Sequence, residues 1–200
     1  MADPRRRAAR RATATALAVA ALLTGCGLGG PQSQTTDRTA VAAALTAVRT
    51  GHCPAQPPDL QATDVTGTGD TLEPLVSDRL LLCGYGRPPG APNGRVLLAS
   101  AALTDRTTIE GFRVALDGLG KPPGGNWSCP GATGAGVLEI FTDGRREVEL
   151  DQDLSGCQEV TNGVRDGWVG TSDLASRVLR LMPRSFCAAI WGPKECAFLG

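Results

Sequence analysis

"VLEIFTDGRREVELD" (residues 137–151) decides the fold, because two alternating runs flank a turn sequence. If Thr142-Asp143-Gly144 form a three-residue loop with Gly144 in the left-handed region, Phe141 faces Arg145 across an antiparallel hairpin. A two-residue loop at Asp143-Gly144 would instead mix carboxylates with apolar residues on each face. The longer loop separates the apolar from the acidic side chains, with Leu138, Ile140, Val148 and Leu150 on one face and Glu139, Glu147, Glu149 and Asp151 on the other.

A second hairpin and a helix are expected earlier in the chain. Residues 78–85 and 95–103 are apolar runs of strand length on either side of a turn-rich segment that contains several Gly and Pro residues. Residues 104–119 then have Thr or Asp at the start and apolar side chains at helical spacing. This order predicts two strands followed by a helix.

The C-terminal part repeats the same order of elements. Thr171 or Ser172 can cap a helix that Pro183 ends. Hairpin, connection and helix therefore occur twice, at 79–119 and 137–181, which indicates a weak internal duplication. Two such units predict an α+β fold, in which an antiparallel sheet of about four strands has helices on one face.

Six of the seven cysteines follow the N-terminal region. An even number of cysteines outside the cytoplasm favours disulfides, although six cysteines allow fifteen pairings. Metal ligation is the alternative, but the chain has no Cys-x-x-Cys pair and a single histidine. The favoured pairs are Cys129–Cys157, opposite one another in the extended hairpin register, Cys187–Cys196, nine positions apart, and the remaining Cys53–Cys83.

The N-terminal region has the layout of a secretory signal. Five arginines precede an apolar run from Ala12 to Leu23, which is shorter than the roughly twenty residues that span a bilayer as a helix. The run ends in Leu23-Thr24-Gly25-Cys26, which resembles the bacterial lipobox and implies a lipidated Cys26 as the first mature residue. An ordinary secretion signal with an incidental cysteine is the alternative.

Three regions are expected from these signals. Residues 1–25 form a lipoprotein signal peptide, residues 26–37 a flexible tether and residues 38–200 a single extracytoplasmic domain. Removing residues 1–25 takes five Arg and one Asp from 20 basic and 20 acidic residues, which leaves 15 against 19 and a net charge of −4. Nucleic acid is therefore not an expected partner, because no basic stripe remains to bind a polyanion.

Acidic residues at alternating positions are the first candidates for chemistry. Glu147, Glu149, Asp151 and Asp153 share one face of a strand, where they can hold calcium or act as paired acids. A half-exposed strand shows the same alternation, so a solvated face is the alternative. His52, in a Pro-rich loop and without a Gly-x-Ser-x-Gly motif in the chain, is interpreted as an exposed loop residue. No catalytic residue, metal ion or cofactor is predicted.

Aromatic side chains in turn-rich segments are the candidates for binding. Trp127, Trp168 and Trp191 lie in such segments, and Tyr85 lies at the start of the loop GYGRPPGAPNGR (84–95). Exposed tryptophans can stack on sugars or enter a partner's pocket, whereas tryptophans near cysteines can pack on disulfides instead. The binding residues expected on this basis are Tyr85, Trp127 and Trp168.

A further resemblance concerns the segment GCQEVTNG (156–163). Together with the acidic strand, it resembles small actinobacterial lipoproteins and secreted proteins of unassigned function, over roughly residues 75–165. The resemblance implies a location at the extracytoplasmic face of the cell membrane and no particular activity. We therefore expect a non-enzymatic module, held on the membrane by lipid on Cys26, that binds an envelope protein or glycan. The alternative is an envelope hydrolase that uses carboxylates such as Glu147 and Glu149.

Overall fold

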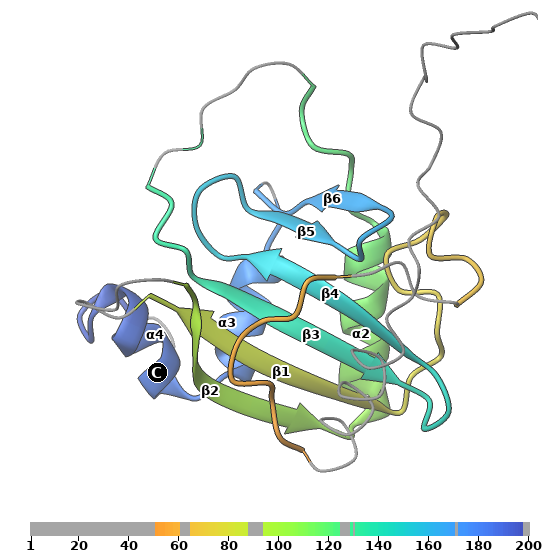
Figure 1. Cartoon of the computed structure of the whole chain (residues 1–200), viewed down its shortest axis with the longest axis horizontal. Coiled ribbons are helices and arrows are strands. Elements are labelled where there is room, and N and C mark those ends of the chain that lie inside the picture. Colours follow the sequence, from red (N-terminus) through yellow and green to blue (C-terminus); the bar gives the residue numbers. More distant parts are fainter. Residues whose placement is uncertain are drawn as a thin grey trace, which may run out of the picture. The chain divides into compact units, whose positions relative to one another are not determined.

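A six-stranded antiparallel sheet organises the chain in the computed structural model, which describes residues 51–60, 65–87, 94–124, 129, 131–170 and 172–197. The strand order is β2-β1-β3-β4-β5-β6 (Figure 1). The strands are β1 (Arg79–Gly86), β2 (Val96–Leu103), β3 (Gly136–Thr142), β4 (Glu147–Asp153), β5 (Glu159–Thr161) and β6 (Asp166–Trp168). The expected α+β class is confirmed, but the sheet has six strands rather than about four.

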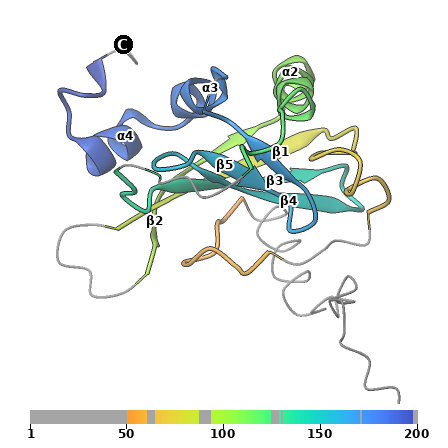
Figure 2. The ribbon, with the colours of Figure 1, turned by 90° about the horizontal axis from the view of Figure 1, so that it is seen from above.

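Helices lie on one side of this sheet, as expected (Figure 2). Within the described residues they are α2 (Arg106–Asp117), α3 (Leu174–Leu181) and α4 (Arg184–Trp191). The side chain of Asp105 caps α2 by accepting a hydrogen bond of 2.9 Å from the Thr108 N–H. The apolar residues at helical spacing in α2 are buried, which confirms the periodicity seen in the sequence: Ile109, Phe112 and Leu116.

The C-terminal helical region differs from the expectation. Asp173, not Ser172, stands at the N-cap of α3, while the Ser172 hydroxyl accepts a hydrogen bond of 3.3 Å from the Leu174 N–H. Pro183 ends α3 but also precedes α4, because proline is tolerated where a helix begins. The additional helix α4 buries Phe186 against the sheet.

The register of the β3–β4 hairpin differs from the one expected. Thr142 pairs with Glu147 and Phe141 with Val148, so the turn has four residues, 143–146, and the pairing of Phe141 with Arg145 is wrong. The Asp143 carboxylate selects this turn by accepting hydrogen bonds from the backbone N–H groups of residues 145 and 146. The observed pairing is shifted by three positions from the expected one. Because three is an odd number, the β3 side chains share a face with the other set of β4 side chains than expected.

Apolar side chains of β3 can lie on either face of the sheet, because other parts of the chain cover both faces. Leu80 and Leu82 of β1 face the core below the helices, whereas Leu81 and Cys83 face a second, smaller apolar cluster. Segment 51–60, the orange chain beneath the sheet in Figure 2, contributes to this second cluster. The expected side of Glu139 is wrong, because it presumes a sheet with one buried face, whereas Glu139 pairs with Leu150 on the helix side.

The β5–β6 hairpin was missed because its strands have only three residues each. Asn162, in the turn between them, holds it against the loop before β1. Its side-chain amide donates hydrogen bonds to the carbonyls of Thr68 (2.9 Å), Thr71 (3.3 Å) and Leu72 (3.0 Å). This single side chain therefore joins segments about ninety positions apart in the sequence.

Three disulfides connect the six cysteines in the expected pairs. The Cα–Cα distances are 5.6 Å for Cys53–Cys83, 4.8 Å for Cys129–Cys157 and 5.9 Å for Cys187–Cys196. Cys129–Cys157 forms although the register used to predict it is wrong by three positions, because both residues lie beyond the ends of the hairpin. Disulfides of this number indicate an oxidising, extracytoplasmic setting.

Candidate functional site

The acidic residues of β4 share one face, as their alternation predicts, but this face is not uniformly solvated. It also carries Ile140, which pairs with Glu149. Glu147 is buried, Glu149 and Asp151 are half-buried, and Asp153 is exposed. The acids therefore occupy graded environments along the strand, and each has a different capacity to hold charge.

An ion pair between Arg95 and Asp151 lies on this face. Two guanidinium nitrogens of Arg95 donate hydrogen bonds of 2.8 Å to the two carboxylate oxygens of Asp151. The guanidinium passes directly over Gly136, where a Cβ atom would collide with its Nη2 atom. It also lies 6.0 Å from the ring centre of Tyr85, whose hydroxyl donates a hydrogen bond of 2.9 Å to the Pro54 carbonyl.

Tyr85 was expected at an exposed binding surface, and that expectation is wrong. The side chain is completely buried on the second face of the sheet, because segment 51–60 lies over it and accepts a hydrogen bond from its hydroxyl. Burial, followed by the negative charge of Glu149, raises the pKa of Tyr85. The buried Tyr85 ring therefore lies beside the Arg95–Asp151 ion pair and helps to hold the Arg95 guanidinium in place.

Glu149 is the acid on this face best suited to exchange a proton near neutral pH. Burial raises its pKa from 4.5 to about 7, and its Oε1 atom has no hydrogen-bond partner among the described residues. Partial desolvation of its carboxyl group, followed by the charge of the neighbouring Asp151, also raises the pKa of Asp153, although most of that residue is exposed. A carboxyl that titrates near neutrality can act as a general acid or base if a substrate reaches it.

Glu139 lies on the opposite face, in the apolar core under the helices. It is 0% exposed, and neither carboxylate oxygen has a hydrogen-bond partner among the described residues. Gln152, on the same face of β4, is equally buried, and its amide atoms also have no partner within the described part of the chain. Burial, the largest cause, raises the pKa of Glu139 well above 4.5, which favours the neutral form of this carboxyl.

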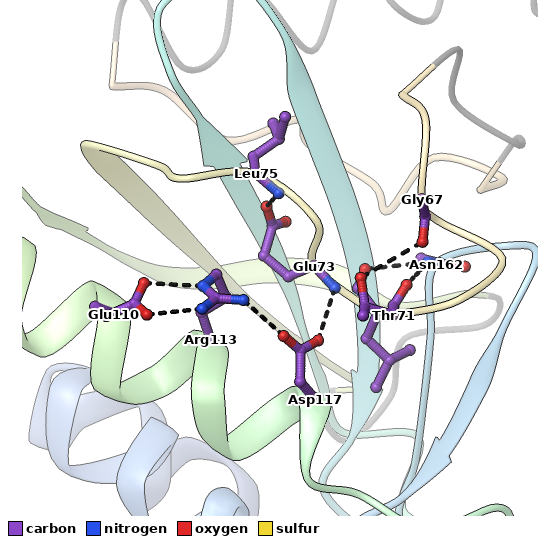
Figure 3. Close-up of polar contacts among 9 residues, drawn as sticks. Gly67, Thr71, Glu73, Leu75, Glu110, Arg113, Asp117 and Asn162 are labelled. Atoms are coloured by element: carbon purple, nitrogen blue, oxygen red, sulfur yellow. Dashed lines mark hydrogen bonds and ion pairs between the residues drawn. The ribbon is translucent and has the colours of Figure 1, made fainter.

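A third buried carboxyl, Glu73, is tied to α2 (Figure 3). Its Oε1 atom accepts a hydrogen bond of 2.7 Å from the Leu75 N–H, and its own N–H donates to Asp117 at 3.4 Å. Arg113 connects Asp117 to Glu110 with hydrogen bonds of 2.7 to 2.8 Å. Burial raises the pKa of Glu73 to about 8. The hydrogen bond from the Leu75 N–H lowers this pKa, but by less than burial raises it.

A cavity of about 390 Å³ opens where β1, α2 and the β3–β4 turn meet, and its lining comprises Val76, Ser77, Asp78, Arg106, Glu110 and Asp143. Two of its acids are already paired, Glu110 with Arg113 and Asp143 with Arg146. Hydrogen bonds from Arg146, chiefly from its backbone N–H, lower the pKa of Asp143 to about 2. The Arg106 side chain is 80% exposed and lies 3.9 Å from Asp78, so its guanidinium can bind an additional acceptor.

The other predicted residues that the structure describes do not line this cavity. His52 is exposed in segment 51–60. Trp168 is half-buried in β6, and its backbone N–H donates to the Gly120 carbonyl at 2.9 Å. Trp191, in α4, packs partly against the core. Cys26 and Trp127 lie outside the described residues, as do the signal peptide and tether.

Arg95, Glu73 and Arg106 were not predicted as site residues. Their roles depend on contacts between distant segments, and each looks like an ordinary surface charge in the sequence. In the described part of the chain, no group of three or more His, Cys, Asp or Glu side chains can hold a metal ion. None of the helices described is long and apolar enough to cross a bilayer.

Comparison with known proteins adds no relative to this picture. The chain matches no protein-family model, and searches among curated proteins and solved structures find no significant similarity. Function is therefore argued from the residues and their geometry alone.

Proposed function

We propose that this chain is a non-enzymatic binding module, anchored by lipid on Cys26 at the extracytoplasmic face of the cell membrane. The observation that carries the proposal is the set of three disulfides within one α+β domain, which follows an N-terminal region that resembles a lipoprotein signal. Disulfides of this kind persist outside the cytoplasm. The acylated cysteine would keep the domain at the membrane surface.

The cavity beside α2 is the described site best suited to receive a partner group. Its volume lies within the range of small-ligand pockets, and Arg106 and Asp78 offer both a donor and an acceptor at its surface. Val76 is 83% exposed at its rim and provides apolar contact area. An envelope protein that presents a polar side chain next to an apolar one fits this combination best.

The anchor is tested by mass spectrometry and cell fractionation. The full chain, expressed in a bacterium that processes lipoproteins, should carry acyl mass on Cys26 and sediment with membranes. Cys26→Ala should abolish both while the three disulfides still form. Wild-type protein without acyl mass would refute the anchor.

The partner site is tested by photo-crosslinking from position 76 in intact cells. A crosslinked protein should appear in the wild-type background and be lost when Arg106→Glu is added. Arg180→Glu, an exposed charge change on α3, is the matched control and should leave the crosslink intact. A crosslink indifferent to Arg106→Glu would exclude this cavity as the binding site.

The second candidate function is an envelope hydrolase that uses Glu149. The observation in its favour is the pKa of about 7, which allows this carboxyl to donate or accept a proton near neutral pH. Turnover of envelope glycans or peptides should then be lost in Glu149→Gln and retained in Glu195→Gln, a change at an exposed position. Absence of turnover in the wild-type protein removes this candidate.

A further inference from the structure

The two edges of the sheet are very different. One edge is β6, which has three residues and begins with a charged one, Asp166. The other edge is β2, which has eight residues, VLLASAAL, with neither a charge nor a proline. Natural proteins usually shorten, charge or cover their edge strands, because an open edge pairs with other chains. β6 is short and charged, as this rule expects, whereas β2 is neither.

Contacts from other described segments cover the first residues of β2 but not its whole length. The Leu97 N–H donates a hydrogen bond of 3.2 Å to the Ala55 carbonyl, and Leu98 is an extra residue at a bulge opposite β1. On the helix side, α4 packs against β2. From Ala99 to Leu103 the pairing with β1 is regular, and Ser100 and Ala102 are exposed. These five residues form the open part of the edge within the described chain.

The sequence of this open edge is suited to pairing with itself. When two identical strands pair antiparallel about a twofold axis, facing residues must share the same hydrogen-bonding parity, so their numbers add to an even sum. A register centred on Ala101 uses all five open residues. It places Ser100 opposite Ala102, and Ala99 opposite Leu103, of the second copy. The facing side chains are mostly small, so the two backbones can approach to sheet distance without steric conflict.

We propose that β2 is a dimerisation edge, at which two copies of this chain pair antiparallel over Ala99–Leu103 into one continuous sheet. The six strands of each copy would then form a sheet of twelve. Ile190 and Trp191, in α4 beside this edge, are only partly buried within one copy. Pairing would bring apolar surface from the two copies together on the helix side of the new seam. This inference is independent of the proposed binding site.

Sedimentation and light scattering of the full chain test the dimer over a wide range of concentrations. The wild-type protein should reach twice the mass that the same preparation shows as a single chain under denaturing conditions. Ser100→Lys combined with Ala102→Lys should raise the dissociation constant about tenfold or more, because like charges then face each other at two places. Val114→Lys, at an exposed position on α2, should leave the dimer unchanged.

A charge-complementary variant tests the register itself. Ser100→Lys combined with Ala102→Glu should regain the dimer, whereas Ser100→Glu combined with Ala102→Glu should not. Circular dichroism and the masses of the disulfide-linked peptides establish that each variant is folded. A wild-type chain that stays monomeric, even if it pairs with an added peptide strand, would overturn the proposal. So would a dimer that survives both like-charged variants.

Discussion

Arg95 reaches Asp151 across the space that a side chain at position 136 would fill. The two hydrogen bonds between them are each 2.8 Å long, and the guanidinium lies against the backbone of β3 at Gly136. The pair therefore depends on a residue that takes part in neither bond. Gly136 would be interpreted in the sequence as a weak point of a strand, but here the missing side chain is the structural requirement.

Gly136→Ala should destabilise the protein by about 1–3 kcal/mol, because its Cβ would collide with Arg95 and lie 2.9 Å from the Gln152 carbonyl. Chemical denaturation measures the effect. Gly111→Ala is the matched control, since nothing lies within 4 Å of its Cβ position and the residue is inside α2. The control should be stabilising by about 0.5–1 kcal/mol. Equal effects of the two substitutions would contradict the packing described at Gly136.

Glu139→Met should stabilise the protein by about 1–3 kcal/mol at pH 7, because it removes a buried carboxyl with no partner among the described residues. The two side chains are similar in length, so the core need not rearrange greatly. Thermal and denaturant unfolding give the change in free energy. Glu195→Met, at an exposed position, should change stability by less than about 0.5 kcal/mol. A loss of stability in Glu139→Met would mean that the carboxyl makes a favourable contact.

Glu73 should make the folded protein less stable as pH rises. Its pKa is about 8 in the folded state and 4.5 in the reference state, so the unfolded chain releases a proton first. The stability it contributes is fully present below pH 4.5 and is lost as pH rises toward 8. Between these limits the free energy of unfolding should fall by about 4 kcal/mol more in the wild type than in Glu73→Gln. Identical pH profiles for the two proteins would refute this assignment.

Asn162→Ala should loosen the loop before β1, because three backbone carbonyls lose their side-chain donor. We expect a loss of about 1–3 kcal/mol and faster amide hydrogen exchange at Asp70 and Thr71. Asn162→Asp retains the oxygen that accepts from the Val164 N–H, but it places a carboxylate against the carbonyls. The Asp variant should therefore exchange at least as fast as the Ala variant. Unchanged exchange in both would show that other contacts hold the loop.

The fold was predictable where the signal is local. Strands β1 and β2 and helix α2 lie close to the expected ranges, because hydrophobic periodicity and the Asp105 cap act within a few residues. The pairs Cys187–Cys196 and Cys53–Cys83 also followed from spacing and order, whereas Cys129–Cys157 was expected from a register that is wrong. The short β5–β6 hairpin and α4 were missed, since their stability comes from packing against distant segments and not from their own pattern.

The hairpin register and the site were not predictable by the same means. Placing every carboxylate on a solvated face assumes a sheet with one covered side, but segment 51–60 covers the second side here. That segment also buries Tyr85, which looks in the sequence like a loop residue available to a partner. Arg95 gives no local signal, because its role arises from crossing a glycine on a strand more than forty residues away.

The bridge between Cys53 and Cys83 determines where a mechanical load would enter the domain. Cys83 lies in β1, which has hydrogen-bonded neighbours on both sides in β2 and β3. A pull on the chain before Cys53 would therefore be transmitted through a covalent link to an interior strand, and segment 51–60 would not peel away first. If the chain is held at a membrane by its N-terminus, force from a bound partner is resisted by shear between three strands.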